Sequence, residues 1–71
     1  MIGSLTPAEA RAAPLIALPI DIAAARLDRS PSRVKQLFRG IADKLGAADT
    51  KGAIVLAVRA GIEIEILPAR H

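Results

Sequence analysis

The sequence predicts an all-α domain of four helices with short connections, followed by a short extended C-terminal tail. Two observations lead to this prediction. Residues that favour helix N-termini occur at four points of the 71-residue chain, and the longest segment between them carries apolar residues at the spacing of one helix face. A chain of this length builds a single hydrophobic core. We therefore expect one domain over residues 1–61, with residues 62–71 as its tail.

The first helix is predicted to begin after Thr6. The Thr6 hydroxyl can accept a hydrogen bond from a free backbone N–H, and Glu9 can reach back to the N–H of Thr6. Pro7 is tolerated because the first helical position needs no N–H donor. Pro14 must end or kink this helix, because proline lacks the donor that an inner turn requires.

A second, shorter helix is predicted over residues 22–27, with Asp21 as its N-cap. Its sequence is rich in alanine and has few large side chains. Such small residues allow another helix to approach closely.

The third helix carries the longest periodic pattern of the chain. Ser30-Pro31 repeats the signal of a capping residue followed by proline. The apolar residues that follow form one stripe of a helix: Val34, Leu37, Phe38, Ile41, Ala42 and Leu45. Gly46 is expected to end the helix. Phe38 is expected in the core, and Gly40 within the helix costs up to about 1 kcal/mol relative to alanine.

The fourth helix is predicted to open near Asp49-Thr50 and to finish before Gly61. Beyond it, residues 62–66 alternate strictly between isoleucine and glutamate, which is the period of a strand. We expect the tail to fold back over its own domain or to pair within a dimer. The other possibility is that it adds to the sheet edge of a partner.

The composition argues against an enzyme. The chain has no cysteine, and its one histidine, His71, lies at the C-terminus without partners to orient it. We therefore expect no metal site, no cofactor and no catalytic site.

The most apolar stretch, residues 12–25, is shorter than the roughly twenty residues of a membrane span and is interrupted by Pro14, Pro19 and Asp21. We therefore expect a soluble cytoplasmic protein that does not enter a membrane. The mean hydropathy of +0.38 is high for so small a soluble domain. It predicts apolar surface left for a partner, most simply a second copy of the chain.

Positive charge is concentrated in the middle of the chain. The whole chain carries +3, whereas residues 26–44 hold six basic residues against two acids. The side chains of the third helix that lie largely away from its apolar stripe are Ser32, Arg33, Lys35, Gln36, Arg39 and Asp43. Arginine and lysine can bind guanine, glutamine can bind adenine, and serine can hold a phosphate. This face is either an interface for duplex DNA or a solvated helix face.

Five short motifs resemble the LuxR/FixJ-type (GerE-like) helix-turn-helix domain and cover residues 5–61. They are Leu5-Thr6-Pro7-Ala8-Glu9; Ala24 to Leu27; Ser30-Pro31-Ser32-Arg33-Val34-Lys35; Ile41 with Lys44-Leu45-Gly46; and Ala53, Ala57 and Gly61. The spacing from Leu27 to Gly61 matches the family without a gap. The chain differs at Arg33 and Leu37, where the family has threonine and histidine, and its first-helix region is about two residues shorter.

The resemblance implies a scaffold helix over residues 23–27 and a recognition helix over residues 31–45 in the major groove. The positions that match contacts to base edges or nearby phosphates are Lys35, Gln36 and Arg39. The positions that match contacts to the DNA backbone are Ser32, Arg33 and Lys44. The positions on the last helix that match a dimer interface are Ile54, Val55 and Val58.

We therefore expect a small stand-alone transcription regulator that binds double-stranded DNA as a homodimer. The alternative is a protein-interaction module of the same fold, which binds a larger LuxR-type regulator through its last helix or its tail. Binding of single strands by stacking is disfavoured, because Phe38 is the only aromatic residue and lies on the apolar stripe.

Overall fold

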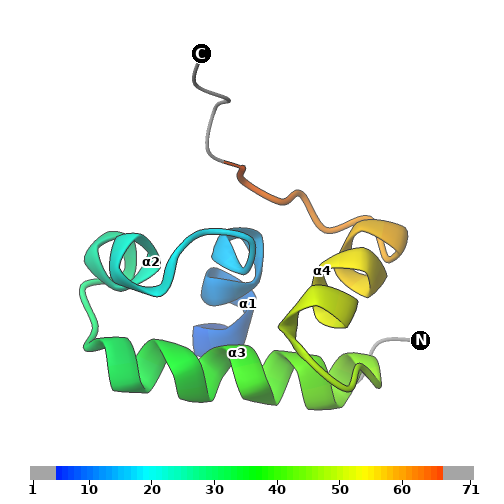
Figure 1. Ribbon diagram of the computed structural model, residues 1–71, viewed down its shortest axis with the longest axis horizontal. Coiled ribbons are helices and arrows are strands. Elements are labelled where there is room, and N and C mark those ends of the chain that lie inside the picture. Colours follow the sequence, from blue (N-terminus) through cyan, green and yellow to red (C-terminus); the bar gives the residue numbers. More distant parts are fainter. Residues whose placement is uncertain (1–4, 67–71) are drawn as a thin grey trace.

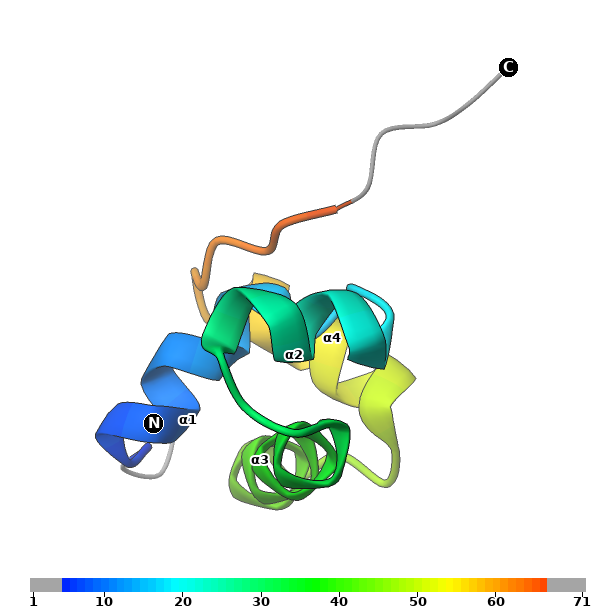
Figure 2. The same ribbon diagram turned by 90° about the vertical axis from the view of Figure 1, so that its left-hand side faces the viewer.

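The computed structural model describes residues 5–66, which form an all-α fold. The elements are α1 (Pro7–Ala12), the 3-10 turn η1 (Ala13–Leu15), α2 (Ile20–Leu27), α3 (Pro31–Leu45) and α4 (Thr50–Arg59). Helices α1, α2 and α4 pack on one side of the long helix α3, and the opposite side of α3 is uncovered (Figures 1 and 2). Within residues 5–66, no helix has the length and apolar character that crossing a bilayer requires.

The start of α1 is the capping box that the sequence predicts. The backbone N–H of Glu9 donates to Thr6 Oγ1 at 3.2 Å, and the N–H of Thr6 donates to Glu9 Oε1 at 3.0 Å. At Pro14 the helical conformation does not end but continues as the tighter 3-10 turn η1. This is a common form of a helix end where proline removes the N–H that an α-helical hydrogen bond needs. Residues 7–15 therefore make one kinked helical segment.

The predicted start of α2 is wrong by two residues. The helix begins at Ile20 with Pro19 as its N-cap, and Asp21 lies in the first turn without a capping bond. Pro19 explains the difference, because its ring holds φ at −54° and its carbonyl accepts the first helical bond, from the N–H of Ala23. Asp21 still lies at the helix N-terminus, where a negative charge is favourable.

Helix α3 matches its predicted limits. Ser30 Oγ accepts a hydrogen bond from the N–H of Arg33 at 3.2 Å, and Gly46 ends the helix with φ at +78°, a conformation that glycine adopts without strain. The apolar stripe is confirmed as core: Val34, Leu37, Phe38, Ile41 and Ala42 are buried and Leu45 is half-buried.

Helix α4 also begins where the sequence predicts. The Asp49 carboxylate accepts a hydrogen bond from the N–H of Gly52 at 2.8 Å. Ala53 and Ala57 are fully buried on its inner face, and their small side chains allow α4 to lie close to its neighbours. Val55 and Val58 on the other side are exposed.

Residues 62–66 of the tail are extended, as the sequence predicts, and within the described part of the chain they pair with no strand. Ile62 and Ile64 pack against the core, and the N–H of Glu65 donates to the Pro14 carbonyl at 2.8 Å. The first part of the tail therefore folds back over its own domain, whereas Ile66 is 74% exposed. A ladder needs a neighbouring strand, and the segment beside the tail is the turn η1. Residues 67–71 of the predicted tail lie outside the described part of the chain.

Candidate nucleic-acid interface

The uncovered face of α3 carries polar and basic side chains along its length. Ser32, Gln36, Arg39 and Asp43 follow one another at helical spacing opposite the apolar stripe, and all four are exposed. Arg33 and Lys35 flank this row, one on each side, and are also exposed. Five of the six predicted DNA-binding residues thus lie on one continuous surface.

The surface protrudes because of how the other helices pack. The view along the axis of α3 shows α1, α2 and α4 gathered on one side of it (Figure 2). Three residues, Asp28 to Ser30, connect α2 to α3. Asp28 adopts a left-handed conformation with φ at +54°, and this turns the chain sharply into α3. A long helix is therefore held at the edge of the domain with one side open.

Internal ion pairs remove two of the six cations in residues 26–44 from this surface. Arg26 pairs with Glu65 of the tail, and Lys44 pairs with Glu9 of α1. Over residues 5–66, no ion pair is formed by the other four, Arg29, Arg33, Lys35 and Arg39. Among the cations of residues 26–44, the unpaired ones therefore lie on the turn before α3 and on the first two-thirds of α3 itself.

Two polar contacts organise this charge locally. Arg33 Nη1 donates to Gln36 Oε1 at 3.4 Å, and Arg29 Nη1 donates to the Asp28 carbonyl at 3.0 Å. Both contacts are exposed, so an incoming phosphate or base can replace them at little cost. Asp43 marks the end of the basic part of the face.

Lys44, the sixth predicted DNA-binding residue, is placed apart from the other five. Its Nζ donates to Glu9 Oε1, and the Glu9 side chain is only 10% exposed. The sequence does not reveal this contact, because 35 residues separate the two partners and no local pattern links them. The structure gives Lys44 a part in joining α1 to α3.

The Glu9 carboxylate is held by two groups at once. It accepts hydrogen bonds from Lys44 Nζ and from the N–H of Thr6. These two bonds, together with the positive charge of Lys44, lower the pKa of Glu9 below its usual value. Burial of the carboxylate acts in the opposite direction but has the smaller effect. A Cβ at residue 40 would collide with Glu9 Oε2. Gly40 therefore lets the carboxylate lie directly against α3, and this explains the glycine that the sequence places inside a helix.

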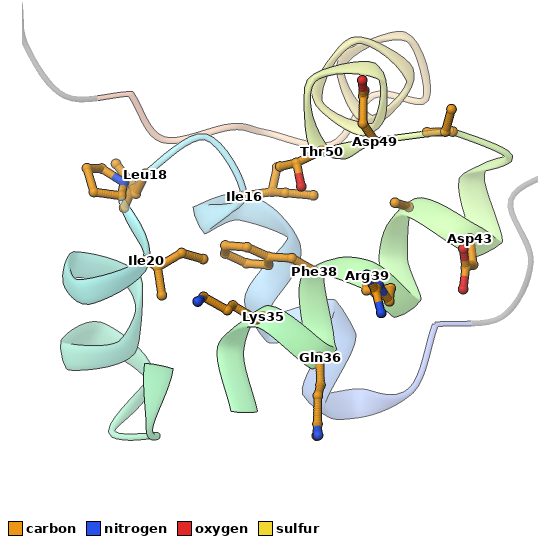
Figure 3. Close-up of a pocket in the computed structure, with 14 residues that line it drawn as sticks. Ile16, Leu18, Ile20, Lys35, Gln36, Phe38, Arg39, Asp43, Asp49 and Thr50 are labelled. Atoms are coloured by element: carbon orange, nitrogen blue, oxygen red, sulfur yellow. The ribbon is translucent and has the colours of Figure 1, made fainter. Parts of the chain in front are cut away.

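A groove of about 730 Å³ lies along the other flank of α3 (Figure 3). Its walls are the connection into α2, the face of α3 next to Phe38, and the loop into α4. Lys35 and Arg39 line its edge, so the groove adjoins the basic face. Over residues 5–66, no group of three His, Asp or Glu side chains is placed to hold a metal ion.

The three predicted dimer residues of α4 differ in how far their side chains are exposed to solvent. Val55 and Val58 are 54% and 58% exposed, whereas Ile54 is half-buried and packs against the core. The two valines lie one turn apart between the exposed cations Lys51 and Arg59.

Comparisons of the chain with protein-family models, with curated proteins and with solved structures found no match.

Proposed function

We propose that this chain binds double-stranded DNA, with α3 lying in the major groove. The observation that carries the proposal is the uncovered face of α3, on which Arg33, Lys35 and Arg39 lie beside Gln36 and form no ion pair with any residue from 5 to 66. An α-helix with its side chains is about 10–12 Å across, close to the width of the major groove of about 12 Å. The short connection from α2 to α3 agrees with a helix-turn-helix unit.

The residues of the uncovered face fall into two groups, according to whether they can reach the bases or the phosphates of the DNA. Gln36 and Arg39 occupy the middle of the open face and Lys35 its edge, so these three are proposed to contact bases or the phosphates next to them. Ser32 and Arg33 lie at the start of α3, where side chains and helix N–H groups favour phosphate. Lys44 is left out of the proposed interface because Glu9 holds its ammonium group.

We propose that two copies bind together through α4. Val55 and Val58 are the exposed large apolar residues of this helix, and a two-fold contact would cover them. The resemblance to the LuxR/FixJ-type domain points to the same helix.

The matched pair Arg39→Ala and Arg59→Ala tests the DNA-binding proposal. Both substitutions remove one exposed arginine, but Arg39 lies on α3 and Arg59 ends α4. Loss of a base contact at Arg39 is expected to weaken binding to a selected duplex by about 1–3 kcal/mol, with less effect on random DNA. Arg59→Ala is expected to leave the preference for the selected duplex unchanged. Equal losses from both variants would show that only net charge matters, and would refute a role for α3 in reading bases.

A second candidate function is a protein-interaction module that pairs through α4 with a larger regulator. The same exposed valines favour it, whereas Ile62 and Ile64 of the tail are already packed on the domain. Sedimentation of the purified chain separates the two candidates. A dimer that Val58→Asp dissociates supports the homodimer, and a monomer at all concentrations refutes it and leaves the two valines free for another protein.

A further inference from the structure

The groove beside α3 has the lining of a small-molecule site. Its volume of about 730 Å³ lies within the range of roughly 300–1,000 Å³ that is usual for ligand pockets. The ring of Phe38 lies across the middle, with Ile20 on one side and Ile16 on the other (Figure 3). Phe38 and Ile16 are only 3% and 2% exposed, so they form a closed apolar floor, and the half-buried Ile20 adds apolar wall beside it.

The charges at the groove select a negative head group. Lys35 and Arg39 rise from α3 on either side of Phe38, and within residues 5–66 neither forms an ion pair (Figure 3). They are one helical turn apart, so both can reach a single anion. The two acids of the lining, Asp43 and Asp49, point away from the groove in Figure 3, and the Asp49 carboxylate caps α4 by accepting from the N–H of Gly52.

We propose that this groove binds a small amphiphilic carboxylate. The hydrocarbon chain lies over Phe38 between the α2 and α4 walls, and Lys35 and Arg39 hold the head group at the edge. A carboxylate suits this pair, because it accepts charge-assisted hydrogen bonds from lysine and two parallel bonds from arginine.

The position of the groove makes it a control site for the proposed function, on which this part of the inference rests. Lys35 and Arg39 are two of the residues proposed to contact DNA. A carboxylate that engages both side chains neutralises them and turns them toward the flank of α3. Ligand and duplex therefore compete for the same two cations.

Decanoate, kept below its micelle concentration, is the probe for the groove, with decanol as the uncharged control. Methyl NMR signals of Ile16 and Ile20 are expected to shift on titration with decanoate, whereas those of Val55 and Val58 on α4 stay in place. Decanol is expected to bind up to roughly fivefold more weakly for each ion pair it cannot make. Equal affinity for the two molecules, or shifts centred on Val55 and Val58, would overturn the proposal.

Variants of the two cations assign the head group. Lys35→Gln and Arg39→Gln are each expected to weaken decanoate binding by up to roughly fivefold and to leave decanol unaffected. The control Arg59→Gln removes the same charge from α4 and is expected to change neither titration. These substitutions are at exposed positions, so the fold is retained. If the Arg59 variant weakened decanoate as much as the Arg39 variant, the head group would not lie at the groove.

The titration needs no DNA, so it judges the groove separately from the proposed function. A chain that binds decanoate in this pattern but binds no duplex would refute the proposed function and support the site. A chain that binds a duplex but not decanoate would refute the site alone. Where both bind, decanoate is expected to weaken duplex binding, and an unchanged duplex affinity at saturating decanoate would overturn the competition.

Discussion

The inner and outer faces of α3 differ in almost every physical respect. The inner face buries Val34, Phe38 and Ile41 beneath the other three helices, whereas the outer face exposes Gln36 and Arg39 and is covered by no helix of the described chain. Substitutions on the inner face change the packing of the core and therefore the free energy of unfolding. Substitutions on the outer face change only what the domain can bind. One 15-residue helix thus supplies both stability and the candidate interface, and the two contributions can be separated by mutation.

The largest expected effect lies at the centre of the inner face. Ile41 is fully buried, so Ile41→Ala is expected to cost about 2–5 kcal/mol of unfolding free energy through lost contacts and a residual cavity. That is a large part of the roughly 4–10 kcal/mol expected for a domain of this size. Urea unfolding followed by circular dichroism measures it. The unfolding free energy of Arg39→Ala, on the outer face, is expected to stay within about 0.5 kcal/mol of the wild type. A loss as large as that of Ile41→Ala would show that the outer face also stabilises the fold.

The flank of α3 that meets α1 is expected to make stability depend on pH. The pKa of Glu9 is lowered in the folded chain, so its stabilising effect is fully present above the unfolded value near 4.5 and is lost as the pH falls through the folded value. Glu9→Gln is expected to cost about 1–3 kcal/mol at pH 7 and less at pH 3. Urea midpoints at the two pH values test this. Asp43→Asn, which removes an exposed acid of α3 next to Lys44 in the chain, serves as the control, and an equal pH response of both variants would count against the Glu9–Lys44 pair.

Gly40 offers a test in which the sign of the effect reverses. In the wild type, Gly40→Ala pushes the Glu9 carboxylate out of its place and is expected to destabilise the fold by about 1 kcal/mol, even after the gain in helix propensity. In a Glu9→Ala background the obstacle is gone, so the same substitution is expected to stabilise by up to about 1 kcal/mol. A double-mutant cycle of unfolding free energies measures this coupling. Destabilisation of equal size in both backgrounds would show that Gly40 is needed for another reason.

The smallest expected effect lies at the tail, far from both faces of α3. Glu65 pairs with Arg26 at a site where both side chains are nearly half exposed, so Glu65→Gln is expected to cost less than about 1 kcal/mol. Ile64→Ala, which removes a half-buried side chain from the core edge, is expected to cost more. Thermal unfolding of both variants checks the order. The reverse order would mean that charge, and not apolar contact, holds the tail.

Local chemistry explains why most of the fold could be predicted. Thr6, Ser30 and Asp49 cap their helices with their own side chains, and Gly46 ends α3, so these limits follow from a few adjacent residues. The start of α2 was missed because its N-cap is a proline without a side-chain bond. The alternation in residues 62–66 predicts an extended chain, but it cannot show whether a second strand lies beside it.

The candidate site was predictable only in part. Helical periodicity places Gln36 and Arg39 on the outer face, as the structure does. It cannot show that Lys44 pairs with Glu9, because the contact depends on how α1 packs across α3. A glycine in the middle of a strongly amphipathic helix was the one available signal, since Gly40 marks where another group approaches closely. The groove beside Phe38 had no signal in the sequence, because three separate elements form it.

The most direct test of the central claim is to let the purified chain select from random 30-base-pair duplexes at about 0.15 M salt, where non-specific attraction is reduced. The proposed function predicts enrichment of a two-fold symmetric motif whose half-site spacing fits two copies of α3. Arg39→Ala is expected to lose that motif. Weak binding with no enriched sequence would contradict the claim that the outer face of α3 reads DNA.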